Sequence, residues 1–292
     1  MEAFFRAQKP IDLHLHSNVS DGTDTPAEVV RAAHSAGVRT MALTDHDTTA
    51  GWSEAAAECS RLGMTFIGGM EITARGARGG GVHMLAYLFD PEEEELLAAV
   101  NNTLDARIPR LQEMTDRLAN DFDITWDDVL AESDGKSIGR PHLASAMIRR
   151  GHATDTDDFF ERIVTKDSKY FISSPGIDVR DVIRLVRQAG GVAITAHPVG
   201  RHSHVMPREH MVALKAAGLH GFELGHRENK KNPEGLAALT RYAEEFDLIV
   251  TGSSDYHGTR KPNRPGEFQT EPEMLMRIID ESTGYAPIYP EL

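Results

Sequence analysis

Two histidines near the start of the chain stand two residues apart, in the segment Ile-Asp-Leu-His-Leu-His-Ser at residues 11–17. Strict alternation places Asp12, His14 and His16 on one face of a predicted strand and the apolar residues on the other. Side chains two residues apart on a strand are separated by roughly 7 Å, so both imidazoles can reach one metal ion. Taken alone, the pattern is equally compatible with a half-buried strand that has one polar face.

Further histidines and carboxylates occur at or beside the ends of later predicted strands. They are Asp21 in an Asp-Gly turn, His46 in Thr-Asp-His, Glu71, His197 in His-Pro, and Asp255 and His257 in Ser-Asp-Tyr-His. His83 differs, because it lies at the start of its predicted strand. Each of these residues has an ordinary explanation as a turn, cap, loop or surface acid. Together they form a mixture of imidazoles and carboxylates that suits several transition-metal ions.

The elements that must position these residues alternate between strand and helix. Strands are predicted from residue 11 and over 40–44, 64–72, 82–89, 192–196, 219–224 and 248–251, and helices from 26 to Gly37 and over 49–62, 179–189, 211–217, 233–246 and 273–281. Thr25, Pro26 and Glu28 have the spacing of a capping box at a helix start. The alternation favours a barrel-like α/β domain with parallel strands, in which functional residues gather at the carboxyl ends of the strands.

A helical segment interrupts this alternation. Residues 91–120 are predicted to form one long charged helix, followed by shorter helices at 126–130 and 142–150. No convincing strand occurs between 93 and 166. We therefore assign residues 1–92 and 167–292 to the catalytic barrel, and residues 93–166 to a small helical insertion domain that covers the mouth of the active site.

The composition limits the classes of partner. The 292 residues carry a formal net charge of -14, which argues against broad electrostatic binding to nucleic acid. No run of eighteen apolar residues is present, and the first ten residues lack the apolar core of a signal peptide. The single cysteine, Cys59, excludes an intrachain disulfide. We expect a cytoplasmic protein without a membrane partner.

The motifs resemble those of the polymerase and histidinol phosphatase (PHP) superfamily of metal-dependent phosphoesterases. The matching segments lie at residues 12–17, 20–22, 44–46, 69–71, 82–83, 196–198 and 254–257, and all nine expected ligand positions are filled. The resemblance implies a distorted (β/α)7 TIM-like barrel that holds three divalent metal ions. Mn, Fe and Zn all suit a histidine-rich site with oxygen ligands.

The resemblance also implies a ligand set for each ion. The first would be held by His14, His16, Glu71 and Asp255; Glu71 would bridge to a second, also held by His83 and His197; and Asp21, His46 and His257 would hold the third. Three divalent ions outweigh three carboxylates, so a phosphate dianion meets an attractive site despite the acidic surface. Metal ions lower the pKa of bound water from about 16 toward 7. We therefore expect a bridging hydroxide to attack phosphorus, with Glu71, Asp255 and His257 as catalytic residues.

Four residues outside this set are candidates for substrate binding. Arg140 and His142 occur in the segment Ile-Gly-Arg-Pro-His, and a guanidinium fork matches a phosphate group in a bidentate manner. The alternative is a helix-start arginine on a solvated face. Arg201, which follows the His-Pro motif, and His226 are the other two candidates.

The leading functional hypothesis is hydrolysis of a small phosphomonoester, a nucleotide or a nucleoside 3',5'-bisphosphate, which similarity to stand-alone PHP proteins suggests. The alternatives are 5'-3' exonuclease action on short oligonucleotides and a histidinol-phosphate phosphatase. Long nucleic acid is disfavoured as a partner, because no basic and aromatic stacking stripe is present. An amidohydrolase with a carbamylated lysine bridge is disfavoured too, since no lysine occurs between Lys9 and Lys136. A non-catalytic metal-binding module is disfavoured by the complete ligand set.

Overall fold

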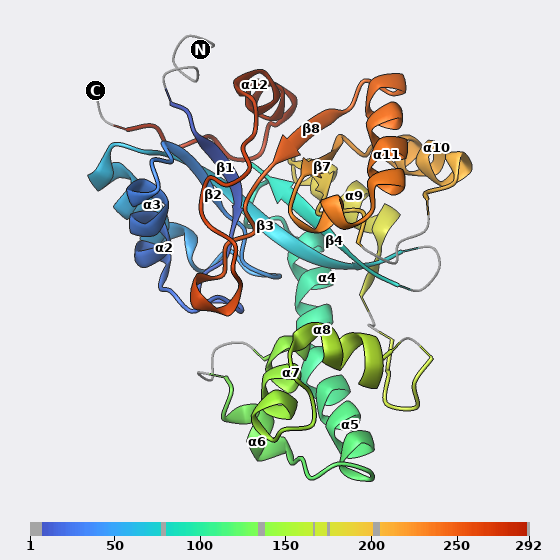
Figure 1. Ribbon diagram of the computed structural model, residues 1–292. Helices are drawn as coiled ribbons and strands as arrows, with labels where there is room; N and C mark the ends of the chain where they lie inside the picture. Colours follow the sequence, from blue (N-terminus) through green and yellow to red (C-terminus); the bar gives the residue numbers. More distant parts are fainter. Residues whose placement is uncertain are drawn as a thin grey trace.

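The computed structural model describes residues 8–76, 80–133, 138–165, 167–173, 176–200 and 205–290. Within them one eight-stranded sheet has the order β1 (Ile11–Leu15), β2 (Thr40–Leu43), β3 (Thr65–Arg75), β4 (Gly81–Tyr87), β6 (Val192–Thr195), β7 (Gly221–Gly225) and β8 (Ile249–Gly252), and the short β5 (Ile177–Asp178) pairs with β3. The segment after β8 returns to β1, where the His16 N–H donates to Tyr256 O at 2.8 Å. The sheet therefore forms a nearly closed barrel with helices outside it, which confirms the predicted α/β barrel class (Figure 1).

One strand runs against the predicted direction. β4 is antiparallel to both β3 and β6, whereas the other neighbouring pairs are parallel. The expectation of parallel strands throughout is wrong at this position, because only residues 76–80 separate β3 from β4 and a parallel crossover needs a dozen or more residues. The reversal brings the start of β4, and with it His83, to the edge at which the parallel strands end.

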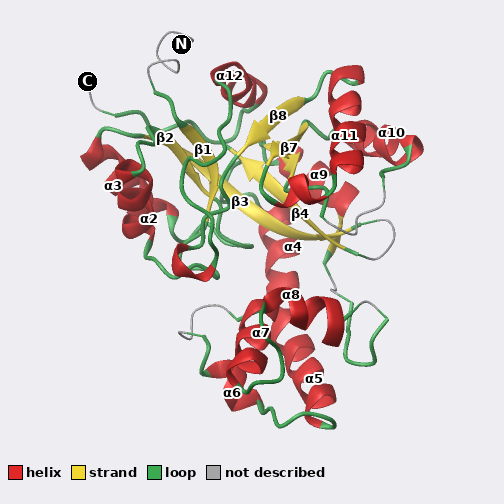
Figure 2. Cartoon of the chain, in the orientation of Figure 1, coloured by secondary structure: helices red, strands yellow, loops and turns green. Residues whose placement is uncertain are grey.

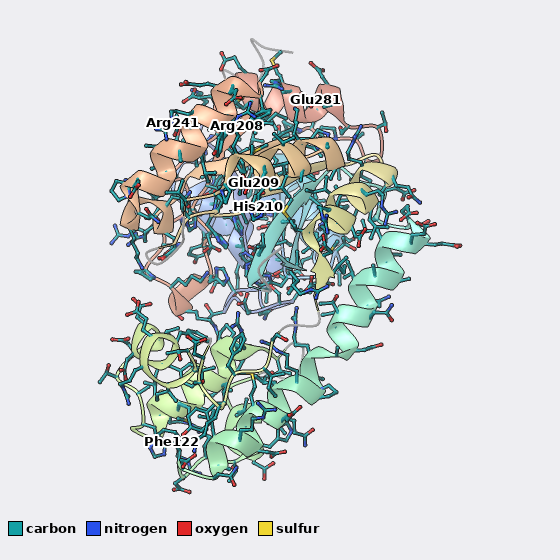
Figure 3. All side chains as sticks on the ribbon, turned by 90° about the vertical axis from the view of Figure 1, so that its right-hand side faces the viewer. Phe122, Arg208, Glu209, His210, Arg241 and Glu281 are labelled. Carbon is teal, nitrogen blue, oxygen red and sulfur yellow. The ribbon has the colours of Figure 1, made fainter. Side chains whose placement is uncertain are left out.

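Helices surround the barrel (Figure 2). They are α2 (Pro26–Ser35), α3 (Trp52–Leu62), α9 (Val179–Gln188), α10 (Arg208–Ala217), α11 (Pro233–Glu245) and α12 (Pro272–Glu281). The predicted capping box is present, since the Glu28 N–H donates to Thr25 Oγ1 at 3.3 Å and the Thr25 N–H donates to the Glu28 carboxylate at 2.8 Å. Charged side chains of α10 and α11, including Arg208, Glu209 and Arg241, lie on the outside of the molecule (Figure 3).

The insertion forms a helical lobe beside the barrel (Figure 1). Its elements are α4 (Glu94–Asp105), α5 (Arg107–Ala119), α6 (Trp126–Leu130), α7 (Arg140–Arg149), α8 (Thr156–Asp158) and a π-helical turn at Phe159–Ile163. The single helix predicted over 91–120 is divided at Ala106, because Pro109 has no N–H and its ring would clash with the Asp105 carbonyl in a continuous helix.

The helices of the insertion contribute to two apolar cores. Leu96 and Val100 of α4 pack in the barrel cluster, whereas Leu111 and Met114 of α5 belong to a cluster formed by the insertion itself. The division of the chain at residue 93 stays a prediction. No helix of the described ranges is long and apolar enough to cross a membrane.

The close pairing of β7 with β8 generates a test of the fold. A Cβ on Gly221 would lie 2.1 Å from the carbonyl oxygen of Ile249, its partner in the parallel ladder. We expect Gly221→Ala to lower the free energy of unfolding by about 1–3 kcal/mol, because the strands must separate to accept the methyl group. Urea denaturation measures the change. Gly81→Ala is the control, since a Cβ there meets nothing within 4 Å, and an equal loss in both variants would contradict the prediction.

Candidate metal centre

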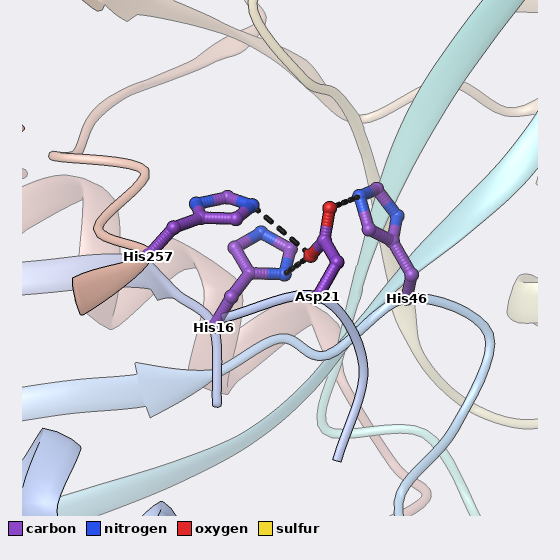
Figure 4. Close-up of side chains that lie close together, drawn as sticks. All are labelled: His16, Asp21, His46 and His257. Carbon is purple, nitrogen blue, oxygen red and sulfur yellow. Dashed lines mark ion pairs between the residues drawn. The ribbon is translucent and has the colours of Figure 1, made fainter. Parts of the chain in front are cut away.

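All nine predicted ligands meet at one rim of the barrel. His14 lies in β1 and His16 directly follows it; Asp21 and His46 lie in the loops after β1 and β2; Glu71 is in β3; His83 is in β4; and His197, Asp255 and His257 follow β6 and β8. The donor atoms of eight of them, all except His197, form three overlapping groups whose members lie within 4.8 Å of one another: His14, His16, Glu71 and Asp255; His16, Asp21, His46 and His257; and His46, Glu71 and His83. Figure 4 shows the second group around the Asp21 carboxylate.

The first group coincides with the predicted first ligand set. His14 Nε2 lies 2.9 Å from His16 Nε2 and 3.1 Å from Glu71 Oε2. Asp255 Oδ1 lies 3.5 Å from His14 Nε2. All four side chains are buried at the end of the barrel. Two imidazoles and two carboxylates are thus gathered around one point.

Glu71 also contacts the members of the predicted second set. His83 Nδ1 and His197 Nε2 each lie 3.0 Å from Glu71 Oε1. The third predicted set, Asp21, His46 and His257, is joined by His16, whose Nδ1 is 3.8 Å from Asp21 Oδ1. The groups therefore share donors more widely than the predicted sets do, and the assignment of each residue to an ion stays a prediction.

The tautomers of two histidines test whether these groups suit metal ions. His14 Nδ1 donates to Glu223 Oε1 at 2.9 Å, which leaves Nε2 as the nitrogen that faces His16 and that can offer a lone pair to a metal ion. His257 Nδ1 donates to the Asp255 carbonyl at 2.9 Å, and its Nε2 then faces Asp21 Oδ1 at 3.1 Å. These assignments follow from the hydrogen-bond partners. With these nitrogens deprotonated, their lone pairs and the carboxylate oxygens repel one another unless a cation lies between them, so the donor set fits divalent metal ions.

The rim concentrates negative charge. Burial alone would raise the pKa of the Glu71 carboxyl, but His46 and His14 beside it hold that pKa well below its usual value. Burial likewise opposes ionisation of Asp255, whereas Lys261 and His257 lower its pKa well below the usual range. Lys261 Nζ donates to Asp255 Oδ2 at 2.7 Å. Both acids are therefore ionised in a water-poor site, where their charges attract cations strongly.

The backbone is held in unusual conformations at two candidate ligands. Asp255 has φ 56° and His197 has φ 28°, in the left-handed region that non-glycine residues seldom adopt. Such residues cost of order 1–3 kcal/mol each and persist where the surrounding structure determines them. Here the Asp255 N–H donates to His14 O and the His197 N–H to Glu223 Oε2, both at 2.9 Å.

A cavity of about 220 Å³ lies between the rim and the insertion. Its lining includes Asp21, His46 and His83 on the barrel side and Arg107, Arg110, Arg140 and Phe160 on the insertion side. The guanidinium of Arg140 lies 5.5 Å from the centroid of the Phe160 ring. The structure thus brings Arg140 to the same cavity as three of the predicted ligands.

The other three predicted substrate-binding residues have different surroundings. His142 is buried and its Nδ1 accepts the Gly139 N–H at 3.1 Å, which caps the start of α7. His226 is buried beside the rim, where its Nδ1 accepts the Glu228 N–H at 3.1 Å and its Nε2 lies 3.5 Å from Asp255 Oδ2. Arg201 lies outside the described residues. Roles in substrate binding stay predictions for all of them.

Sequence reasoning missed Glu223, Lys261, Arg107 and Arg110. Glu223 carried a visible signal, because it is an acid in the middle of the apolar predicted strand 219–224. Lys261 and the two arginines lie in charged segments, where nothing in the local pattern distinguishes them from surface residues.

A barrel with a cluster of histidines and carboxylates at its rim, facing arginines across a cavity, defines a metal-dependent phosphoesterase. The sequence pattern of the PHP domain family matches residues 12–125 of the chain. A 5'-3' exoribonuclease from Haemophilus influenzae is 32% identical over 251 residues, covering 85% of this chain and 90% of the relative. A 3',5'-nucleoside bisphosphate phosphatase from Chromobacterium violaceum is 31% identical over 266 residues, covering 88% of each chain.

The structural comparison agrees. The crystal structure of a metal-dependent phosphoesterase from Bifidobacterium adolescentis superimposes with a TM-score of 0.85 and 39% identity, covering 94% of this chain and 98% of the other. The chain belongs to the PHP family, and it is a phosphoric ester hydrolase. The predicted family and enzyme class are confirmed.

Because Glu71 belongs to two of the three donor groups, its removal tests the centre directly. We expect Glu71→Ala to lower the number of bound Mn²⁺ ions and to reduce phosphate release by about 100-fold or more, since metal charge contributes several kcal/mol to the stabilisation of phosphoryl transition states. Elemental analysis and a phosphate assay measure both effects. His152→Ala, which removes a partly buried histidine of the insertion that belongs to none of the donor groups, is the control. A Glu71→Ala protein with full metal content would contradict the role of Glu71 in two donor groups.

Proposed function

We propose that this enzyme hydrolyses a small phosphomonoester of a nucleotide, with a nucleoside 3',5'-bisphosphate as the substrate class that suits the cavity best. The supporting observation is that one cavity has candidate metal ligands on one wall and three guanidinium groups on the other. A substrate with two phosphate groups can occupy both walls at once. A substrate with one phosphate uses only one of them.

The charges of the three arginines support an anion on the insertion side. Arg107 pairs with Asp47, and Arg110 Nε donates to the Ile172 carbonyl at 2.8 Å. Within the described part of the chain, no carboxylate forms an ion pair with Arg110 or Arg140. Burial, together with the neighbouring charges of Arg140 and Arg107, lowers the pKa of Arg110 to about 10. A bound phosphate would relieve this mutual repulsion.

Residues on the barrel side act on the reacting phosphate. Divalent ions held at the rim, which we propose to be three and to be Mn, Fe or Zn, would supply charge for the phosphoryl oxygens and acidify water. Glu71, Asp255 and His257 have catalytic roles as candidate ligands. The Nε2–H of His226 is a donor toward the same region, because its Nδ1 already accepts a backbone N–H. His226 therefore donates a hydrogen bond to a phosphoryl oxygen rather than binding a metal ion.

The relatives support two substrate classes. One acts as a 3',5'-nucleoside bisphosphate phosphatase and another as a 5'-3' exoribonuclease. An oligonucleotide also presents two neighbouring phosphates, so 5'-3' cleavage of short oligonucleotides is the second candidate. The net charge of -14 disfavours long nucleic acid. Histidinol phosphate fits less well, because its ammonium group would face the three arginines.

A phosphate-release screen tests the proposal. The metal-loaded enzyme is assayed with nucleoside 5'-monophosphates, 3',5'-bisphosphates, short RNAs and histidinol phosphate, in the presence of Mn²⁺, Fe²⁺ or Zn²⁺. We expect the highest kcat/KM with a 3',5'-bisphosphate. Equal or faster hydrolysis of nucleoside monophosphates or histidinol phosphate would contradict the binding of a second phosphate by the arginine wall, the side of the cavity formed by Arg107, Arg110 and Arg140. Preferred stepwise cleavage of RNA would favour the second candidate.

Arg140→Ala tests the arginine wall itself. We expect KM for a 3',5'-bisphosphate to rise by about 10-fold or more with a smaller change in kcat, because a hydrogen bond to a charged group contributes about 1.5–3 kcal/mol and this one exists in both ground and transition states. Steady-state kinetics measure the two constants. Arg150→Ala is the matched control, since Arg150 lies on the same lobe and pairs with Asp128 at 2.7 Å. An unchanged KM in Arg140→Ala would mean that Arg140 has a structural role and does not bind the substrate.

A further inference from the structure

The buried carboxylate of Glu223 contacts two candidate metal ligands without belonging to any of the three donor groups. The residue lies in β7 and its side chain has no solvent exposure. Oε1 accepts from His14 Nδ1 at 2.9 Å, and Oε2 accepts from the backbone N–H of His197 at 2.9 Å. Both oxygens therefore face donors, which only an ionised carboxylate satisfies.

Asn229 holds the backbone of Glu223 in place. Asn229 Nδ2 donates to Glu223 O at 2.7 Å and to Leu224 O at 3.0 Å. Asn229 Oδ1 accepts the N–H of Val199, two residues after His197, at 3.1 Å. One asparagine thus joins the end of β7 to the loop that carries His197. The backbone of Glu223 is therefore joined to the loop of His197, and the carboxylate itself is held by His14 Nδ1 and the His197 N–H.

We propose that Glu223 is a positioning residue that orients two candidate ligands at once, by fixing the tautomer of His14 and the backbone of His197. With its Nδ1–H held by Glu223, His14 keeps the lone pair on Nε2, which faces His16 and Glu71. The hydrogen bond from the His197 N–H to Glu223 stabilises the backbone of His197, whose φ of 28° is unfavourable for a residue other than glycine. This role rests on the proposed metal-dependent function, because it concerns how the chain presents its donors.

An amide of the same size cannot replace the carboxylate. A glutamine has one acceptor and one donor end, whereas the site offers two N–H groups. If the NH₂ group faces His197, two donors oppose each other. If it faces His14, the proton of that ring moves to Nε2 and the lone pair directed at the cluster is lost. Either outcome weakens metal binding while the volume of the side chain is retained.

Glu223→Gln therefore tests the role. The protein is stripped with a chelator and titrated with Mn²⁺, and the free ion is counted by electron paramagnetic resonance without substrate. We expect one class of site to bind about 10- to 100-fold more weakly than in the wild type, as is typical when an outer partner of a ligand is removed. The Mn²⁺ concentration for half-maximal activity should rise in parallel, and excess Mn²⁺ should restore turnover, which a merely structural defect would not show.

Asp45→Asn is the matched control. Asp45 is also a buried carboxylate below the rim, but it accepts from the Ser17 N–H at 2.8 Å and from the Ser17 and Ser20 hydroxyls at 2.6 Å, and a hydroxyl can rotate to suit an amide. It measures the effect of removing one buried negative charge near the cluster. Equal weakening in both variants, or wild-type Mn²⁺ affinity in Glu223→Gln, would overturn the role of Glu223.

A measurement on the unmodified chain guards against a variant that fails to fold. In the Zn²⁺-loaded wild-type protein labelled with ¹⁵N-histidine, His14 should carry its proton on Nδ1. A proton on Nε2 would overturn the proposal. These tests count ions and protons, so they are separate from the substrate screen: a wild type that binds metal but releases no phosphate defeats the proposed function alone.

Discussion

The rim of the barrel is governed by electrostatic repulsion among its own donors. Imidazole nitrogens and carboxylate oxygens face one another at about hydrogen-bond distance, as between His257 Nε2 and Asp21 Oδ1 at 3.1 Å. Such an arrangement is unfavourable in a buried site unless positive charge, carried by protons on the rings or by metal ions, lies between these atoms. The strands, the strained loops and the buried hydrogen bonds around the rim all hold these groups together against that repulsion. The fold therefore forms a site at one edge of the sheet that needs positive charge.

The same requirement explains how an acidic chain can bind an anionic ester. The net charge of -14 describes the whole surface, whereas a phosphate meets only the local field at the cavity. Glu223 adds one more carboxylate to the three predicted from sequence, and three divalent ions would still leave the rim positive. The guanidinium groups of Arg110 and Arg140 contribute charge of the same sign from the opposite wall. Attraction of the substrate is thus a property of the cavity.

Much of this centre could be predicted from sequence, because ligands at strand ends are adjacent in space even when they are distant along the chain. His14 and Asp255 are an example. Short-range signals such as the Thr25 capping box were equally readable. The reversal of β4 was harder, since the length of the connection decides it and the apolar pattern of the strand is the same in both directions. It is this reversal that accounts for His83, the one predicted ligand at a strand start.

The residues that sequence reasoning missed act through long-range packing. Glu223 contacts His14 across the barrel, and the arginines of α5 line the cavity together with residues of distant strands and loops. Pro109 was visible as a helix breaker, but the long apolar spacing around it favoured a continuous helix. Contacts of this kind depend on how whole elements are placed, which local patterns do not encode.

The pairing of Arg107 with Asp47 connects the two walls of the cavity. Asp47 directly follows the candidate ligand His46, and its Oδ1 also accepts the N–H of Thr73 in β3, at 2.7 Å. Arg107 stands at the start of α5, one helical turn before Arg110. The ion pair therefore joins the start of α5 to the loop that presents His46. Because His46 shares its donor groups with both Asp21 and Glu71, the insertion is mechanically linked to the part of the rim where the candidate sites overlap.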